Sequence, residues 1–172
     1  MNSKRHQRLR LATGMASALW AAGREDLDGD QRPARPGDVF VAATGGDLMI
    51  EWLVVDTDAA AKRLRIAPAD DDGHAGSLDV ELDRARHGGL ACVRCALACW
   101  VGDPAFDPRR RTGRLDDATL LRVRSRLAAI ENRSSGPPSR RRAIDDDPDY
   151  RRRMEQIAAV RDVAFGAGFD RA

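Results

Sequence analysis

The chain has 172 residues and a formal net charge of +2, with 42% hydrophobic and 33% charged residues, so a modest core lies beneath a charged surface. This length suits one core with extensions and excludes two domains of ordinary size. No stretch approaches the roughly 18 apolar residues of a membrane span, which argues against a membrane protein. The three cysteines are clustered without a disulfide pattern, so we expect a cytoplasmic protein.

The first 35 residues are expected to form a helix and a linker outside the main domain. Residues 7–22 carry a broad apolar face behind a basic start, which predicts an amphipathic helix. Thr13, Gly14 and Ser17 interrupt the apolar run, which disfavours the alternative of a signal peptide. The stretch that follows is polar and rich in turn residues.

From Pro36 the pattern changes to short strands bounded by Gly, Asp or Pro. The Gly45-Gly46 pair marks a hairpin, and a short turn joins the next two strands. We therefore expect the first three strands to pair consecutively and antiparallel. The predicted strands of this region are residues 38–43, 48–56, 63–67 and 77–82.

The fifth predicted strand is Gly88–Val101, GGLACVRCALACWV, which contains all three cysteines. As a strand it places Cys95 and Cys99 on a wholly apolar face and turns Cys92 and Arg94 to the other face. As a helix it would instead gather the three thiols on one stripe. Glycines at the start and the lack of good helix caps favour the strand.

The same cysteines are the sharpest metal-binding candidates of the chain. Cys92, Cys95 and Cys99 with His87 form a Cys3His set, which is a known zinc ligand combination. The strand interpretation separates Cys92 from the other two thiols, so we expect small buried core residues and no metal. A small zinc-stabilised adaptor is the alternative.

The C-terminal half contains two predicted helices separated by a linker. Residues 102–113 are rich in Asp, Pro and Arg and predict a loop. Residues 115–132 follow with an apolar face and a cap at Asp116 or Asp117, which predicts a helix. Residues 133–149 are expected to be a flexible charged linker. The final segment, 150–172, contains a helix whose apolar face can dock onto this core or onto another subunit.

Arginines accumulate after the predicted fifth strand. Residues 109–142 contain eleven arginines against three acidic residues, a pattern that can contact phosphates. A solvated helix face and linker is the alternative, because stacking aromatic residues are missing there. The candidate nucleic-acid-binding residues are Arg94, Arg109, Arg110, Arg111 and Arg114.

Several short motifs together resemble the MazF/PemK family of toxin endoribonucleases. They are PGDVFVA, WLVVD, the strand-ending Ala67-Pro68 and the run RTGRLDDATLL, and they cover about residues 36–130. The resemblance implies an α+β fold with a small antiparallel SH3-like β-barrel of about five strands. Residues 36–132 would contain this barrel together with the helix at 115–132, and the N-terminal helix and the last C-terminal helix would flank this unit.

The family's active-site pattern is not retained. Ile50-Glu51-Trp52 stands where family members carry an Arg-Pro pair, and Ala69-Asp70 stands where they place a threonine or serine. A cation that stabilises the scissile phosphate and a helping hydroxyl are therefore both absent. The chain also lacks the P-loop, GxSxG, HExxH and GxGxxG motifs. We predict no catalytic residue and no cofactor.

The function expected from the sequence is a non-catalytic protein-interaction or nucleic-acid-binding module in a bacterial assembly. Its expected partner is a protein, with nucleic acid and a second copy of the chain as further candidates. A diverged MazF/PemK-type endoribonuclease is the alternative if the protein is an enzyme.

Overall fold

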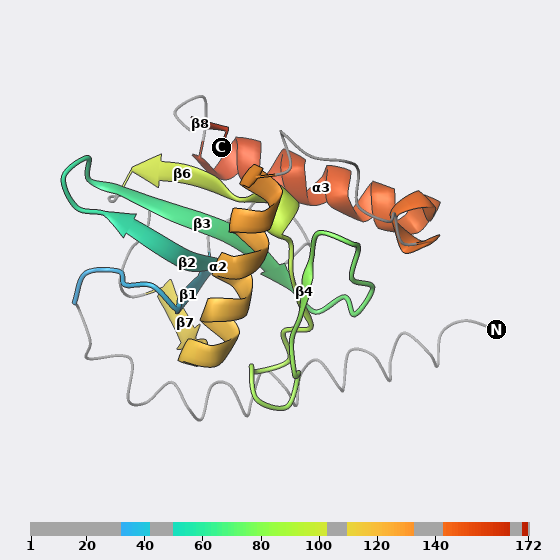
Figure 1. Cartoon of the computed structure of the whole chain (residues 1–172), viewed down its shortest axis with the longest axis horizontal. Helices are drawn as coiled ribbons and strands as arrows, with labels where there is room; N and C mark the ends of the chain where they lie inside the picture. Colours follow the sequence, from blue (N-terminus) through green and yellow to red (C-terminus); the bar gives the residue numbers. More distant parts are fainter. Residues whose placement is uncertain (1–31, 42–49, 103–109, 133–142, 166–169, 172) are drawn as a thin grey trace.

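The structure is a computed structural model that describes residues 32–41, 50–102, 110–132, 143–165 and 170–171. The helix predicted for residues 7–22, the N-terminal linker up to residue 31 and most of the linker predicted at 133–149 lie outside the described residues. Figure 1 shows the described elements as an antiparallel sheet with α2 (Asp117–Glu131) crossing one face. A second helix is α3, Pro148–Phe165.

The strands are short and all their pairings are antiparallel. They are β1 (Asp38–Val41), β2 (Glu51–Asp58), β3 (Arg63–Asp70), β4 (Val80–Glu81), β5 (Cys92–Val93), β6 (Cys99–Gly102), β7 (Arg111–Arg114) and β8 (Asp170–Arg171). The sheet order is β4-β5-β3-β2-β1-β7, with β6 beside β3 and β8 beside β6. The predicted α+β class and the consecutive pairing of the first three strands are confirmed. The path ends at β4 and β7, which do not pair with each other among the described strands.

The cysteine stretch is not a single strand, so that prediction is wrong. The chain forms β5, then the 3-10 turn η1 (Cys95–Leu97), then β6. Both strands pair with β3, β5 at its end and β6 at its start. Because η1 interrupts the alternation, Cys95 packs in the core beside α2 whereas Cys99 packs in the core beside α3.

The predicted loop at residues 102–113 is also partly wrong, because β7 begins within it. Arg111 pairs in register with Phe40 of β1, and Arg114 pairs with Asp38. Sequence patterning misses this strand because no apolar residue marks its inward positions. The guanidinium of Arg111 is buried against a carboxylate instead.

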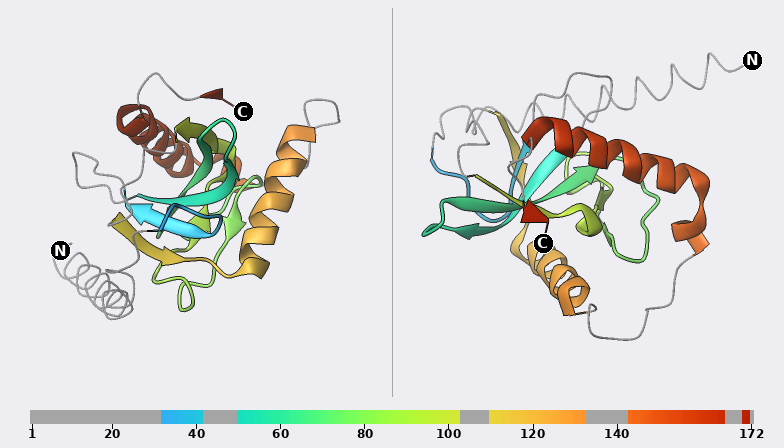
Figure 2. Two further views of the ribbon diagram at one scale, coloured as in Figure 1. Left: turned by 90° about the vertical axis from the view of Figure 1, so that its left-hand side faces the viewer. Right: turned by 90° about the horizontal axis from the view of Figure 1, so that it is seen from above.

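Two apolar cores lie on opposite faces of the sheet. Leu53 and Val55 of β2 pack in one core with the buried side chains of α2, while Trp52 and Val54 pack in the other with Ile157 of α3. Figure 2 shows the two helices on opposite sides of the strands. Successive side chains of β2 point to opposite faces of the sheet, so each face has apolar side chains on which a helix can pack. Full burial of one such side chain contributes about 1.5–3 kcal/mol, and this burial is the main interaction that holds both helices.

Both helices have identifiable starts. The carboxylate of Asp116 accepts a hydrogen bond from the Thr119 backbone N–H at 2.8 Å, so Asp116 is the predicted cap. This hydrogen bond also lowers the pKa of Asp116. The predicted linker ends earlier than expected, because residues 143–146 form the 3-10 turn η5 (Ala143–Asp146) and α3 begins at Pro148.

The last helix docks onto the sheet of its own chain. The ring of Phe165 meets the buried Trp52 ring edge-to-face, with centroids 4.8 Å apart. No helix within the described residues is long and apolar enough to cross a membrane.

Candidate functional site

A tight turn places Asp38 at the start of β1. The backbone N–H of Asp38 donates to the carbonyl of Arg35 at 3.0 Å, and Pro36 and Gly37 occupy the two central positions. Gly37 has φ of +95°, so the residues and the hydrogen bond match a type II turn. A side chain at Gly37 would also lie 3.3 Å from the carbonyl oxygen of Leu115, which explains the glycine.

The carboxylate of Asp38 is fully buried and contacts three arginine side chains. Arg32 binds it with both terminal nitrogens, each at 2.8 Å. The Nη1 of Arg114 donates to Oδ1 at 3.2 Å, and the Nε of Arg111 lies 3.4 Å from Oδ2. The backbone N–H of Arg35 adds a hydrogen bond at 2.9 Å. We call Asp38 with Arg32, Arg35, Arg111 and Arg114 the Asp38 cluster.

The members of the Asp38 cluster differ in exposure. The Arg111 side chain is only 1% exposed, because its guanidinium lies 5.5 Å from the centre of the Phe40 ring and donates to the carbonyl of Arg32. Arg114 is 46% exposed, and Arg35 and Arg110 are also exposed. We call the exposed side chains of Arg35, Arg110 and Arg114 the arginine edge, since β7 ends the sheet order.

A second charged cluster is built around Arg94, whose side chain is fully buried. Its Nε and Nη2 bind both carboxylate oxygens of Asp70, at 3.2 and 2.9 Å, and its Nη1 binds Asp79 at 2.9 Å. The carbonyls of His74 and Asp72 accept two further hydrogen bonds. All five N–H donors of the guanidinium are therefore used within the protein.

Helix α3 completes this second cluster. The Tyr150 hydroxyl donates to Asp79 at 2.9 Å, and Arg153 lies 3.4 Å from Asp70. Burial opposes ionisation of Arg94, but its hydrogen bonds to Asp70 raise its pKa above the ordinary value. Burial, together with the charge of Asp79, raises the pKa of Tyr150. We call Arg94, Asp70, Asp79, Tyr150 and Arg153 the Arg94 cluster, and its contacts tie α3 to the sheet.

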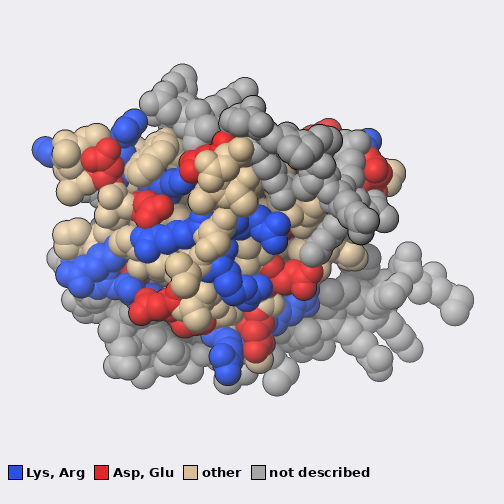
Figure 3. Space-filling view, viewed as in Figure 1, with Lys and Arg blue, Asp and Glu red and all other residues tan. Residues whose placement is uncertain are grey.

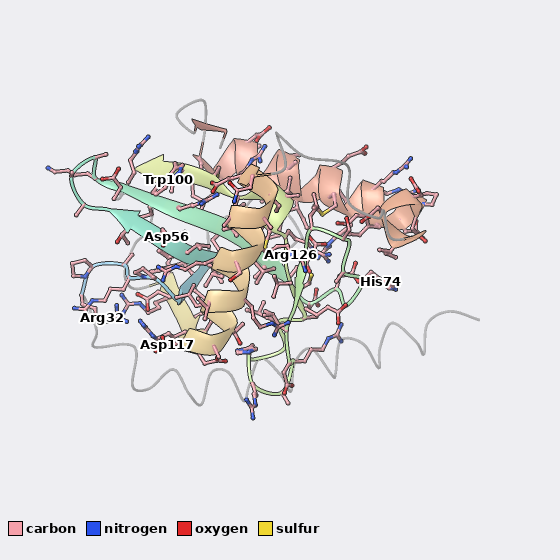
Figure 4. The ribbon with its side chains drawn as sticks, viewed as in Figure 1. Arg32, Asp56, His74, Trp100, Asp117 and Arg126 are labelled. Carbon is pink, nitrogen blue, oxygen red and sulfur yellow. The ribbon has the colours of Figure 1, made fainter. Side chains whose placement is uncertain are left out.

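The two clusters lie far apart. In Figure 4, Arg32 marks the Asp38 cluster on the side of β1 and β7, while His74 marks the loop beside the Arg94 cluster on the opposite side.

The arginines of α2 are used to hold the helix on the sheet. Arg122 donates to the carbonyl of Glu81, Arg126 to that of Ser77, and Arg124 twice to that of Val55. Figure 3 shows basic and acidic side chains interspersed on this face of the molecule. The local excess of arginine in the sequence does not form a continuous basic surface here.

The structure redistributes the predicted nucleic-acid-binding residues. Arg110 and Arg114 are exposed at one edge, whereas Arg109 lies outside the described residues. Arg111 is buried beneath that edge. The prediction that Arg94 binds nucleic acid is wrong, because a fully buried guanidinium with all its donors used cannot contact a phosphate.

The sequence patterns did not identify Arg32, Arg35 and Asp38 as parts of a site. The signal was present in Pro36-Gly37-Asp38, a turn that ends in a carboxylate at the first position of a strand. What it lacked was the pairing of β1 with β7, which brings Arg111 and Arg114 to that carboxylate.

The cysteines lie inside the protein and are free thiols. Burial raises the pKa of Cys95 to about 12 and that of Cys99 to about 11, so both remain protonated at neutral pH. The described residues contain no group of three or more His, Cys, Asp or Glu placed to hold a metal ion. His87 lies 3.5 Å from Asp116, at the start of α2.

A groove of about 510 Å³ lies between α2 and the end strand β4. Leu121, 65% exposed, is one of two large hydrophobic side chains exposed in the described part of the chain. The groove is a second candidate surface, and its lining residues are Asp79, Val80, Glu81, Leu121, Arg122, Ser125, Arg126 and Ala129.

Comparisons of the chain with protein-family models, curated proteins and solved structures find no match in any of the three.

Proposed function

We propose that this chain is a non-catalytic module that binds nucleic acid through phosphate contacts at the arginine edge. The observation that carries the proposal is the convergence of two segments that are distant in sequence. Arg35 contacts Asp38 through its backbone and Arg114 through its side chain, and Arg110 is exposed directly before β7. Exposed arginines at one edge supply sequence-independent affinity for phosphates.

The SH3-like architecture of the MazF/PemK family belongs to this proposal. Its support is a direct contact between two of the motifs that carry the resemblance, PGDVFVA and RTGRLDDATLL. The backbone N–H of Leu115, from Gly113-Arg114-Leu115, donates to the carbonyl of Gly37 at 2.8 Å. The β1-β2-β3 meander and β7 beside β1 add to it. The open sheet would then be a variant of the family's barrel.

The absence of catalysis rests on two neighbouring positions. Glu51 pairs in register with Ala69, and Trp52 pairs with Pro68. The two departures from the family's active-site pattern therefore face each other, and neither position offers a cation or a hydroxyl for RNA cleavage. Trp52 is fully buried. The alternative of a diverged endoribonuclease predicts cleavage of a mixed RNA substrate at high protein concentration. RNA that stays intact under these conditions would exclude this alternative.

The groove beside Leu121 favours a protein partner as the second candidate function. It combines an exposed apolar side chain with charged walls, which is typical of an interaction surface. Substitution of Leu121 by Ser would weaken such a complex while leaving nucleic-acid binding unchanged.

The decisive experiment is a salt titration of oligonucleotide binding, followed by fluorescence anisotropy. Replacing Arg110 and Arg114 together with Gln should lower the slope of log K against log salt by about 1.8 on duplex DNA, since each phosphate contact contributes about 0.9. A matched control replaces Arg86 and Arg152 with Gln. Their side chains are 78% and 71% exposed, and within the described part of the chain they form ion pairs with Asp83 and Asp149.

The two double variants carry the same net charge, so they separate a local site from bulk charge. Equal losses of oligonucleotide affinity in both double variants would show a non-specific charge effect and contradict the proposal that the arginine edge is a binding site. Absence of RNA and DNA binding even at low salt would remove the nucleic-acid function and leave the protein partner.

A further inference from the structure

We infer that Asp38 is a positioning residue that turns the arginine edge into a discrete phosphate site. The inference rests on the proposed nucleic-acid function and names its ligand group, a backbone phosphate. A buried carboxylate at the centre of a surface that binds anions is unexpected, because its charge repels the ligand. A surface that acted only through its total positive charge would bind better without it.

The contacts of Asp38 explain why the carboxylate is retained. Three guanidinium groups approach one another at this point, and they would repel one another without an anion between them. Asp38 holds Arg32 through two parallel hydrogen bonds of 2.8 Å, an arrangement that fixes the plane of the guanidinium. Arg111 is then fixed from behind, by the ring of Phe40 and the carbonyl of Arg32.

Arg114 is the member that connects the buried centre to solvent. Its Nη1 is held by Asp38 at 3.2 Å, yet 46% of its side chain is exposed. A long side chain anchored at one nitrogen has already lost much of its rotamer freedom, so less entropy is lost when it orders on a phosphate. The fork of the guanidinium is then presented in one orientation, which suits a phosphate better than a mobile point charge does.

If Asp38 has only a structural role, its replacement should not lower the affinity of the folded protein for RNA. Asp38 also fastens the turn at Arg35 to β1 and β7, so its loss must reduce stability in either case. The structural role and the positioning role therefore predict different RNA affinities for the fraction of the variant that folds. Replacing Asp38 with Asn changes the formal net charge from +2 to +3, and general electrostatics alone would then strengthen oligonucleotide binding.

The test compares Asp38→Asn with the wild-type chain, using a short fluorescent RNA at fixed ionic strength. We expect the affinity to fall at least about fivefold and the salt slope to fall by about one contact, despite the added positive charge. The control is Asp149→Asn, which makes the same charge change at a 91% exposed carboxylate on α3. Binding by Asp38→Asn that equals or exceeds that of wild type would overturn the inference.

A second variant keeps the test decisive if Asp38→Asn does not fold. Arg114→Lys retains the charge at a half-exposed position but removes the planar fork. A discrete site predicts that Arg114→Lys loses about as much affinity as Arg114→Gln, whereas wild-type affinity for the lysine variant would overturn the inference.

Inorganic phosphate, added against sulfate at equal ionic strength, tests the source of the phosphate. Displacement of the RNA by millimolar phosphate alone would point to a free anion and contradict the nucleic-acid backbone as ligand. No RNA binding by the wild-type chain at low salt would remove the proposed function itself. If the wild-type chain binds RNA and Asp38→Asn binds it more tightly, only the inference about Asp38 is wrong and the proposed function stands.

Discussion

The Asp38 and Arg94 clusters are inverse arrangements of the same residue types. At one end of the molecule a buried aspartate contacts three arginine side chains, and at the other a buried arginine contacts two aspartates. Arg94 has every donor used and no exposed surface, while Arg114 is half exposed. Local arginine density in a sequence therefore does not identify a binding surface. The balance of donors against buried acceptors decides which arginines stay available for a ligand.

The largest expected effect comes from removing the centre of the Arg94 cluster. Arg94→Met leaves Asp70 and Asp79 as buried charges with their main partner gone, so we expect the free energy of unfolding to fall by about 3–5 kcal/mol. Urea denaturation followed by circular dichroism measures it. A loss below about 1 kcal/mol would mean that the two clusters do not differ in their structural role.

Alkaline pH should destabilise the interior that flanks Arg94. Burial raises the pKa of Cys95 to about 12 and of Cys99 to about 11, against 9.0 for an ordinary thiol. Above pH 9 the unfolded chain therefore loses thiol protons that the folded chain keeps, so stability falls as pH rises. Together these two thiols should lower the free energy of unfolding by about 2–3 kcal/mol between pH 8 and pH 10.

The control for this pH dependence is the double variant Cys95→Ala/Cys99→Ala, which should flatten the fall. Cys92 and Tyr150, whose pKa values burial also raises, account for the slope that remains. An unchanged slope in the double variant would contradict the assignment to these two thiols.

The sequence was sufficient for elements that follow a regular period. The capped helix α2 and the strands β1, β2 and β3 carry clear apolar patterns, and all four appear near their predicted positions. The break at η1 was not predictable, because GGLACVRCALACWV is apolar throughout except for Arg94 and has no turn residue between Cys92 and Val101. Pairing with two separate parts of β3 decides the break, and this is a tertiary effect.

The candidate site was only half visible in the sequence for a similar reason. Arg110 and Arg114 were found because arginines are dense there. Arg94 was misassigned, because burial of a charge depends on partners such as Asp70 and Asp79 that lie 24 and 15 residues away. Asp38 was missed because the pairing of β1 with β7 assembles its arginines.

The smallest expected change in stability, and the sharpest contrast in binding, comes from two arginines of similar exposure. Arg114 and Arg124 are 46% and 40% exposed, and each pairs with one aspartate, Asp38 or Asp56. Replacing either with Gln should cost about 0–1 kcal/mol of stability, because both guanidinium groups are partly exposed and the buried Asp38 keeps Arg32 and Arg111 as partners. Only Arg114→Gln should weaken RNA binding in the anisotropy titration, because Arg124 is tied to the carbonyl of Val55 on an electrostatically mixed face. Equal losses of RNA affinity would instead place the nucleic acid across α2, and the arginine edge would no longer be distinct from the rest of the surface.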